Sequence, residues 1–124
     1  MVTVLLVGIG GFIGSVMRYQ AGVWAQTLFG NQWIPYSTLA INVFGCLLIG
    51  VIAGLAETRQ SFSEVSRALV IIGLLGGFTT FSAFGYETMA LVREGNVFSA
   101  TVNVCLQLAL GLTAVWIGFQ LSHW

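Results

Sequence analysis

The stretch Gly76-Gly77-Phe78-Thr79-Thr80-Phe81-Ser82-Ala83-Phe84 lies inside the third of four apolar segments of the chain. It combines a glycine pair with three hydroxyl-bearing residues and three phenylalanines. Glycine loosens a helical backbone, and hydroxyl groups at membrane depth need hydrogen-bond partners. The stretch is therefore unlike a plain lipid-facing helix, and we expect it to be the working part of the molecule.

The composition around this stretch is that of an integral membrane protein. Of the 124 residues, 57% are hydrophobic and only 6% are charged, and the mean hydropathy is +0.95. A soluble domain of this size needs far more polar surface. The four cations, all arginines, form no basic tract for nucleic acid. With one histidine and no aspartate the chain offers no catalytic constellation, so we expect a protein that is not an enzyme.

Four apolar segments predict four transmembrane helices. Each is long enough to cross a hydrocarbon core that needs roughly 20 helical residues. We therefore predict an all-α membrane protein with a single transmembrane domain over residues 1–124, an interfacial turn over 29–36 and a polar loop over 57–67. The predicted helices cover about residues 3–28, 38–56, 68–92 and 97–121.

The arginines do not favour one orientation in the membrane. With the N-terminus inside, Arg59 and Arg67 lie on the inner side, and Arg93 and an outward-reaching Arg18 on the outer side. A chain without a preferred orientation can insert both ways and form an antiparallel two-fold dimer. A weak charge bias alone also fits an ordinary membrane protein, so both readings stay open.

Within the opening stretch, the glycine pair and the aromatic pair suggest two different tasks. Gly76 and Gly77 are expected to break the third helix, and a break frees carbonyls that a neighbour, water or an ion must satisfy. Phe81 and Phe84 are three residues apart and share one helix face. Ring edges are positive, so such a pair could hold a small anion, although plain packing also explains it.

Polar residues in the other segments are candidates for the same pathway. Arg18 either reaches to the membrane interface or lines a water-filled vestibule, and Glu87 is unsuited to simple lipid exposure. Asn42 either faces a pathway or joins two helices by hydrogen bonds. The same two alternatives apply to a narrow polar track in the fourth segment, made by Asn103, Gln107 and Gly111.

The first segment carries a surface of small residues. Such residues at spacings of three and four let helix backbones approach closely in lipid. We expect this surface to serve helix packing; it consists of Gly8, Gly10, Gly11, Gly14 and Ser15.

Three motifs together resemble the Fluc (CrcB-type) family of fluoride channels over essentially the whole chain. Residues 10–19, GGFIGSVMRY, resemble the family's Gly-Gly-x-x-Gly-Ala-x-x-Arg-Tyr. Residues 38–45, TLAINVFG, are similar to Gly-Thr-Leu-x-Val-Asn-x-x-Gly, with Ser37 where glycine is usual. Residues 76–84 resemble Gly-Gly-x-Thr-Thr-Phe-Ser-Thr-Phe, and Ala83 replaces the last threonine, which removes one hydroxyl near the rings.

The resemblance implies an antiparallel, dual-topology homodimer with two pores in the bacterial cytoplasmic (inner) membrane. The family passes fluoride passively, selects against chloride and confers fluoride resistance by exporting the trapped anion. It also implies a structural sodium ion on the dimer axis, held by main-chain carbonyls of the broken helix at Gly76 and Thr79.

The resemblance further assigns roles along the pore. Asn42 would donate to the ion, and Arg18 and Glu87 would form the vestibule. The implied pore residues are Phe81, Phe84, Asn42, Ser82, Thr80 and Gln107.

Two other classes of protein compete with this reading. Small dual-topology multidrug exporters also have four helices, but they depend on a glutamate in the first helix, and here no acid precedes Glu57. An accessory subunit held by glycine-rich packing faces is the non-transport alternative.

Overall fold

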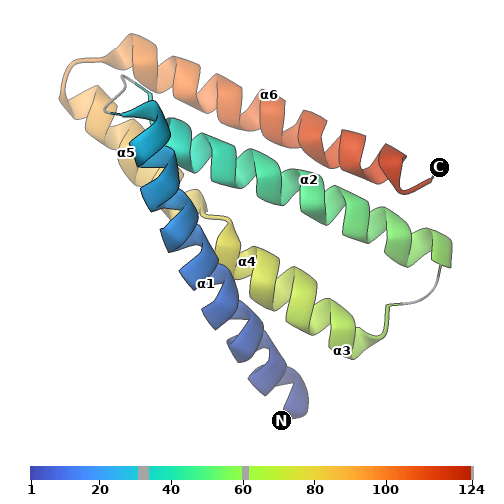
Figure 1. The fold of residues 1–124 in the computed structure, drawn as a ribbon. Coiled ribbons are helices and arrows are strands. Elements are labelled where there is room, and N and C mark those ends of the chain that lie inside the picture. Colours follow the sequence, from blue (N-terminus) through green and yellow to red (C-terminus); the bar gives the residue numbers. More distant parts are fainter. Residues whose placement is uncertain (31–33, 60–61, 124) are drawn as a thin grey trace.

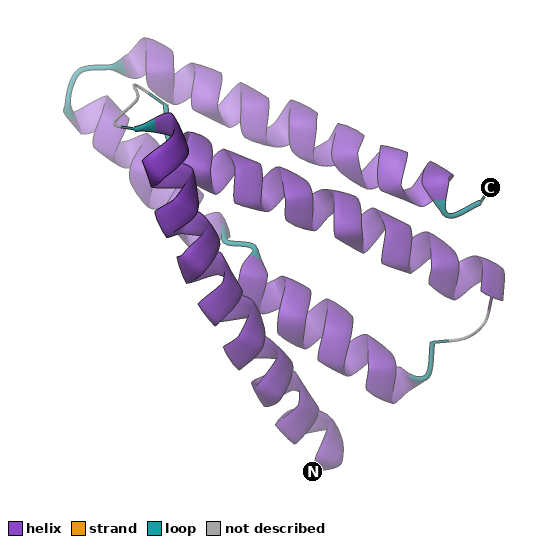
Figure 2. Ribbon diagram, viewed as in Figure 1, coloured by secondary structure: helices purple, strands orange, loops and turns teal. Residues whose placement is uncertain are grey.

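The computed structural model describes residues 1–30, 34–59 and 62–123, with the side chain of Arg59 left aside. This described part is entirely helical (Figures 1 and 2). Its elements are α1 (Val2–Phe29), α2 (Tyr36–Arg59), α3 (Glu64–Arg67), the π-helix η1 (Ala68–Leu75), α4 (Gly76–Phe78), α5 (Phe81–Arg93) and α6 (Val97–Leu121).

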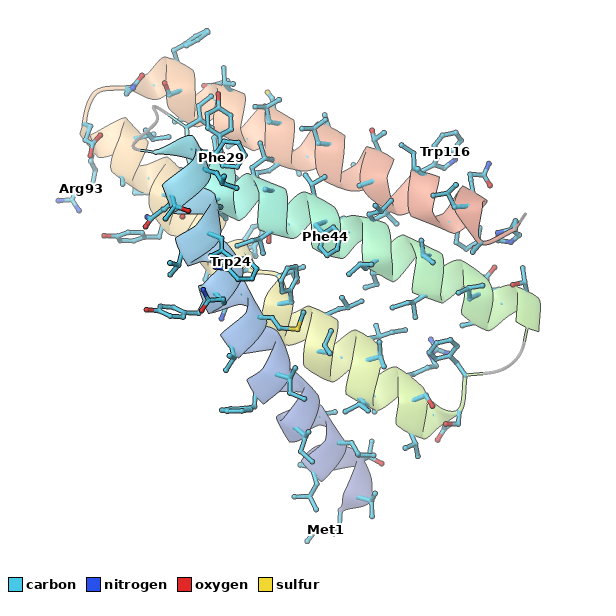
Figure 3. The ribbon with its side chains drawn as sticks, in the orientation of Figure 1. Met1, Trp24, Phe29, Phe44, Arg93 and Trp116 are labelled. Carbon is cyan, nitrogen blue, oxygen red and sulfur yellow. The ribbon has the colours of Figure 1, made fainter. Side chains whose placement is uncertain are left out.

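In the part of the chain that the structure describes, four helical spans are long and apolar enough to cross a membrane, which confirms the predicted number. They contain 28, 23, 30 and 25 residues, and their mean hydropathies lie between 1.6 and 2.4. The third span consists of α3, η1, α4 and α5. Large apolar side chains such as Trp116 point away from the bundle, as lipid-facing residues do (Figure 3).

The polar connection before the third span is shorter than predicted. The sequence indicated a loop over 57–67, but α2 continues to Arg59 and α3 begins at Glu64. Ser63 caps α3, since its hydroxyl accepts a hydrogen bond from the Ser66 N–H at 3.2 Å. Parts of the predicted turn (31–33) and loop (60–61) lie outside the described residues.

The glycine pair is not where helical geometry stops, so that detail of the prediction was wrong. Gly76 has helical dihedrals, with φ −63° and ψ −36°, and α4 continues to Phe78. The extended residues are Thr79 (φ −82°, ψ 157°) and Thr80 (φ −149°, ψ 115°). The Thr80 hydroxyl then caps α5 by accepting from the Ala83 N–H at 3.1 Å.

Two glycines of the third span, Gly73 and Gly77, are explained by close packing against α1. A Cβ atom on Gly77 would lie 2.6 Å from the Gly11 carbonyl oxygen, and one on Gly73 would lie 2.8 Å from that of Val7. On the α1 side, a Cβ on Gly14 would lie 2.9 Å from the Phe78 nitrogen. The predicted packing role is confirmed there, but not for Gly8, which has no such neighbour within 4 Å.

The second close helix pair is α2 with α6. A Cβ on Gly50 would lie 3.0 Å from the Phe119 nitrogen, and one on Gly118 would lie 2.9 Å from that of Val51. Figure 1 shows the pair of α1 with η1 and α4 diverging from the pair of α2 with α6. The two pairs come together near the end where α5 turns into α6.

Candidate functional site

A cavity of about 310 Å³ lies between α2, the third span and α6. Gly111, one of the polar-track residues of the fourth segment, also lines it. The cavity brings together seven of the predicted site residues: Asn42, Gly76, Thr79, Thr80, Phe81, Phe84 and Gln107.

Asn42 holds the main chain where the third span is interrupted. The Thr80 N–H donates to Asn42 Oδ1 at 2.9 Å, and Asn42 Nδ2 donates to the Thr80 carbonyl oxygen at 3.1 Å. Asn42 Nδ2 also donates to Gln107 Oε1 at 3.2 Å. Buried main-chain groups need partners, and this side-chain amide supplies them. Asn42 therefore both lines the cavity and joins α2 to its neighbours.

The aromatic pair stands edge to face beside this amide. The ring centroids of Phe81 and Phe84 are 5.5 Å apart, and the ring planes are inclined by 62°. Phe81 is 81% exposed on the isolated chain, whereas Phe84 is half-buried. The cavity wall therefore offers ring surface next to hydrogen-bonding groups.

Ser82 lies apart from the other predicted pore residues. It is exposed and does not line the cavity. Its hydroxyl lies 3.2 Å from the Thr80 hydroxyl, and this contact connects Ser82 to a residue that lines the cavity.

The interruption leaves a carbonyl available at Gly76. In a continuous helix the Thr80 N–H would donate to that carbonyl, but here it donates to Asn42. Thr79 instead directs both its N–H and its hydroxyl to the Leu75 carbonyl, each at 3.0 Å. Carbonyl oxygens are ligands that hard cations accept. The donor chemistry at Gly76 and Thr79 thus fits a cation, with further ligands needed from elsewhere.

Arg18 lies at a second cavity, of about 300 Å³, which includes Thr38, Thr80 and Ala83. The residue is half-buried. Because Thr80 lines both cavities, the cavity of Arg18 adjoins the one that Phe81 and Phe84 line. The vestibule role of Arg18 stays a prediction.

Glu87 is tied to α2 and lines a third cavity, of about 240 Å³. Its Oε1 accepts a hydrogen bond from the Thr38 hydroxyl at 2.6 Å, and its Oε2 is buried without a partner in the described part of the chain. Thr38 also lines the cavity of Arg18. Thr38 was not among the predicted site residues, although it lies one turn before Asn42 on the same helix face.

The polar residues of α6 have different surroundings. Asn103 is fully buried and donates to the Thr88 hydroxyl at 2.9 Å; that hydroxyl donates to the Phe84 carbonyl at 2.7 Å. Asn103 thus belongs to an interhelical seam, while Gln107 and Gly111 line the central cavity. No sequence pattern pointed to Thr88.

Comparison with known proteins agrees with the motifs. The family described as "CrcB-like protein, Camphor Resistance (CrcB)" matches residues 5–119. A relative from Chloroflexus aurantiacus, named "Fluoride-specific ion channel FluC", is 45% identical over 121 residues, covering 98% of this chain and 95% of the relative.

Two further relatives come from other organisms. One from Methylobacillus flagellatus with the same name is 42% identical over 121 residues, covering 98% of this chain and 94% of its own. "Fluoride-specific ion channel FluC 1" of Methanosarcina acetivorans is 42% identical over 118 residues, covering 95% and 88%. The name of these relatives denotes a class of channels rather than enzymes. The match over nearly the whole chain shows that this protein belongs to the CrcB-like family.

Proposed function

We propose that this protein is a fluoride-selective, passive ion channel. The observation that carries the proposal is the central cavity, where an edge-to-face phenylalanine pair lies beside the Asn42–Gln107 amide pair. The names of the relatives give the same ion.

The phenylalanines and amides suit a small, strongly hydrated anion. Ring edges carry partial positive charge, and amide N–H groups donate to anions without adding a full charge. A site without a full positive charge lets an ion enter and also leave. In the proposed pore the anion passes Phe81, Phe84, Asn42, Ser82, Thr80 and Gln107.

Arg18 and Glu87 are proposed to form the approach to this pore. Arg18 is half-buried and lines its cavity, where its positive charge would attract anions. Glu87 lies on the adjoining cavity that shares Gln26 and Ser37 with that of Arg18.

The working unit is proposed to be an antiparallel, dual-topology homodimer with two pores. Phe81 is largely exposed on one chain, and Gly76 is exposed with only the Ile71 carbonyl, at 3.8 Å, near a hypothetical Cβ. Apart from the Phe84 ring, no contact among the described residues accounts for this exposed ring, and none accounts for the glycine. A second copy against this face supplies one, and the balanced arginines permit both orientations.

A structural sodium ion on the dimer axis belongs to the same proposal. The carbonyls of Gly76 and Thr79 would hold it, together with the same pair from the second copy. Four main-chain oxygens are ligands of the type that a hard monovalent cation accepts, and they add no charge of their own. The ion would stabilise the assembly and take no part in fluoride binding.

We further propose that the protein lies in the bacterial cytoplasmic (inner) membrane as a single transmembrane domain and exports cytoplasmic fluoride, which gives fluoride resistance. Reconstitution in liposomes tests the function. A channel releases fluoride down its gradient without a pH gradient, whereas an exporter of the small multidrug class requires proton coupling. The described α1 holds no acid for such coupling.

A further inference from the structure

Two successive hydrogen bonds join α6 to the main chain of α5 at a buried position. Asn103 Nδ2 donates to the Thr88 hydroxyl at 2.9 Å, and that hydroxyl donates to the Phe84 carbonyl oxygen at 2.7 Å. Because the Thr88 proton points to Phe84, the Thr88 oxygen can only accept from Asn103, which sets the orientation of the Asn103 amide. Asn103 is fully buried and is not among the residues that line the central cavity.

This link between the two helices is costly for stability. Asn103 Oδ1 is buried and has no partner among the described residues, and a buried acceptor without a partner opposes folding. Well-packed apolar side chains of similar volume would avoid that cost and are often neutral or stabilising in place of buried polar groups. A single buried asparagine can instead fix how two helices align. The cost therefore favours a role in alignment over a role in stability.

The link lies one helical turn from the cavity on both helices. Phe84 comes four residues before Thr88 on α5, and Gln107 comes four residues after Asn103 on α6. After the short turn over 94–96, α6 returns alongside α5 (Figure 1). Thr88 and Asn103 thus form one level of this helical hairpin, and Phe84 and Gln107, which both line the central cavity, form the next.

We propose that Thr88 and Asn103 are positioning residues that align α5 with α6 and so bring Phe84 and Gln107 to the same cavity. This inference rests on the proposed function and gives neither Thr88 nor Asn103 a contact with the anion. The short turn joins the helix ends but leaves each helix free to rotate about its axis. A hydrogen bond requires one distance and one direction, whereas apolar side chains tolerate several packings before stability is lost.

Two double variants separate alignment from stability. Thr88→Val with Asn103→Leu roughly keeps the side-chain volumes but removes the link. The size-exclusion profile and the thermal midpoint should match those of the wild type. Fluoride efflux from liposomes should fall about tenfold or more, because a displacement of roughly 1 Å can disable a site.

The second double variant, Thr88→Asn with Asn103→Thr, exchanges the two partners. The new asparagine on α5 can donate to the new hydroxyl on α6, and that hydroxyl can donate to the Ser99 carbonyl four residues earlier. The exchange therefore restores a link of the same kind in the opposite direction. Fluoride efflux should return close to the wild-type rate.

Thr101→Val is the matched control. The Thr101 hydroxyl donates to the Val97 carbonyl oxygen at 2.9 Å, as that of Thr88 does to Phe84, but Thr101 is exposed. This control should conduct as the wild type does. Full efflux in the apolar double variant overturns the inference. Unfolding or aggregation of that variant also overturns it, because the link then only supports the fold, and so does an exchanged variant that conducts no better than the apolar one.

A distance measurement tests the alignment without any flux. Spin labels are attached at Met89→Cys on α5 and Leu112→Cys on α6, two exposed positions, with the native cysteines replaced by serine and labelled chains diluted with unlabelled ones. The intrachain distance should be narrow with the native pair, shifted or broadened in the apolar double variant, and narrow again after the exchange. An unchanged narrow distance in the apolar variant overturns the inference. Wild-type protein that passes no fluoride contradicts the proposed function, while the distances still decide the alignment.

Discussion

The two phenylalanine rings beside Asn42 are the residue-scale basis of the proposed selectivity. Phe81→Ile and Phe84→Ile keep apolar bulk but remove the positive ring edge. We expect each change to lower fluoride efflux at least tenfold, because losing roughly 1.4 kcal/mol of stabilisation already slows passage by that factor. Electrode recordings of liposome efflux measure this directly.

A matched control tests whether a loss of efflux comes from the ring edges in the cavity and not from replacing a phenylalanine in general. Phe98 is an exposed phenylalanine of α6 outside the cavity, and Phe98→Ile should leave efflux unchanged. Size-exclusion chromatography should show the same assembly for all variants. If both cavity variants conduct as well as wild type, the ring edges have no part in conduction.

Single-residue roles were predictable only where a motif or a helix face carried them. Asn42 and the aromatic pair stood out as an amide and two rings in apolar segments, and they do meet at one cavity. The Thr38–Glu87 hydrogen bond joins residues 49 positions apart, and neither segment indicates its partner. Asn42's hydrogen bonds to Thr80 likewise depend on how two spans cross.

At the scale of elements, glycines allow the backbones of α1 and the third span to approach closely. On Gly14 an added Cβ would meet the Leu74 carbonyl and lie 2.9 Å from the Phe78 nitrogen, whereas on Gly22 it meets nothing within 4 Å. Gly14→Ala should therefore destabilise the protein by about 1–3 kcal/mol, as overpacked cores do. Gly22→Ala should be neutral or slightly stabilising, since alanine favours helices by up to about 1 kcal/mol.

Thermal unfolding in detergent, followed by loss of the monodisperse peak, checks this pair of variants. The midpoint should fall for Gly14→Ala and stay or rise for Gly22→Ala. Equal midpoints for Gly14→Ala and wild type would mean that the two helices do not pack as described.

At the level of elements, the length and apolar composition of four segments were enough to predict four spans, because hydrocarbon demands long helices. They were not enough to place the interruption in the third. Glycine permits a break in a helix but also permits close packing. Gly77 packs closely against Gly11. The extended residues are two threonines, stabilised by Asn42 from another helix and by the Thr80 cap. Tertiary contacts decided between the two uses of glycine.

For the whole molecule, the proposal joins two chains through the face that carries the exposed Phe81 and Gly76, with a sodium ion between them. Main-chain carbonyls cannot be replaced by mutation, so the ion itself is the variable. Exchanging sodium for N-methyl-D-glucamine should lower fluoride efflux and shift the protein towards monomer in size-exclusion chromatography, and returned sodium should restore both. If fluoride efflux and the size-exclusion profile do not change when sodium is exchanged, the proposal of a structural sodium ion is contradicted.

The most direct measurement of the central claim is anion efflux from liposomes that hold the purified protein. Vesicles loaded with equal fluoride and chloride, and made permeable to the counter-ion, are followed with an electrode for each anion. We predict rapid fluoride release without a pH gradient, and chloride release no faster than from protein-free vesicles. No fluoride release, or equal release of both anions, would contradict a fluoride-selective channel.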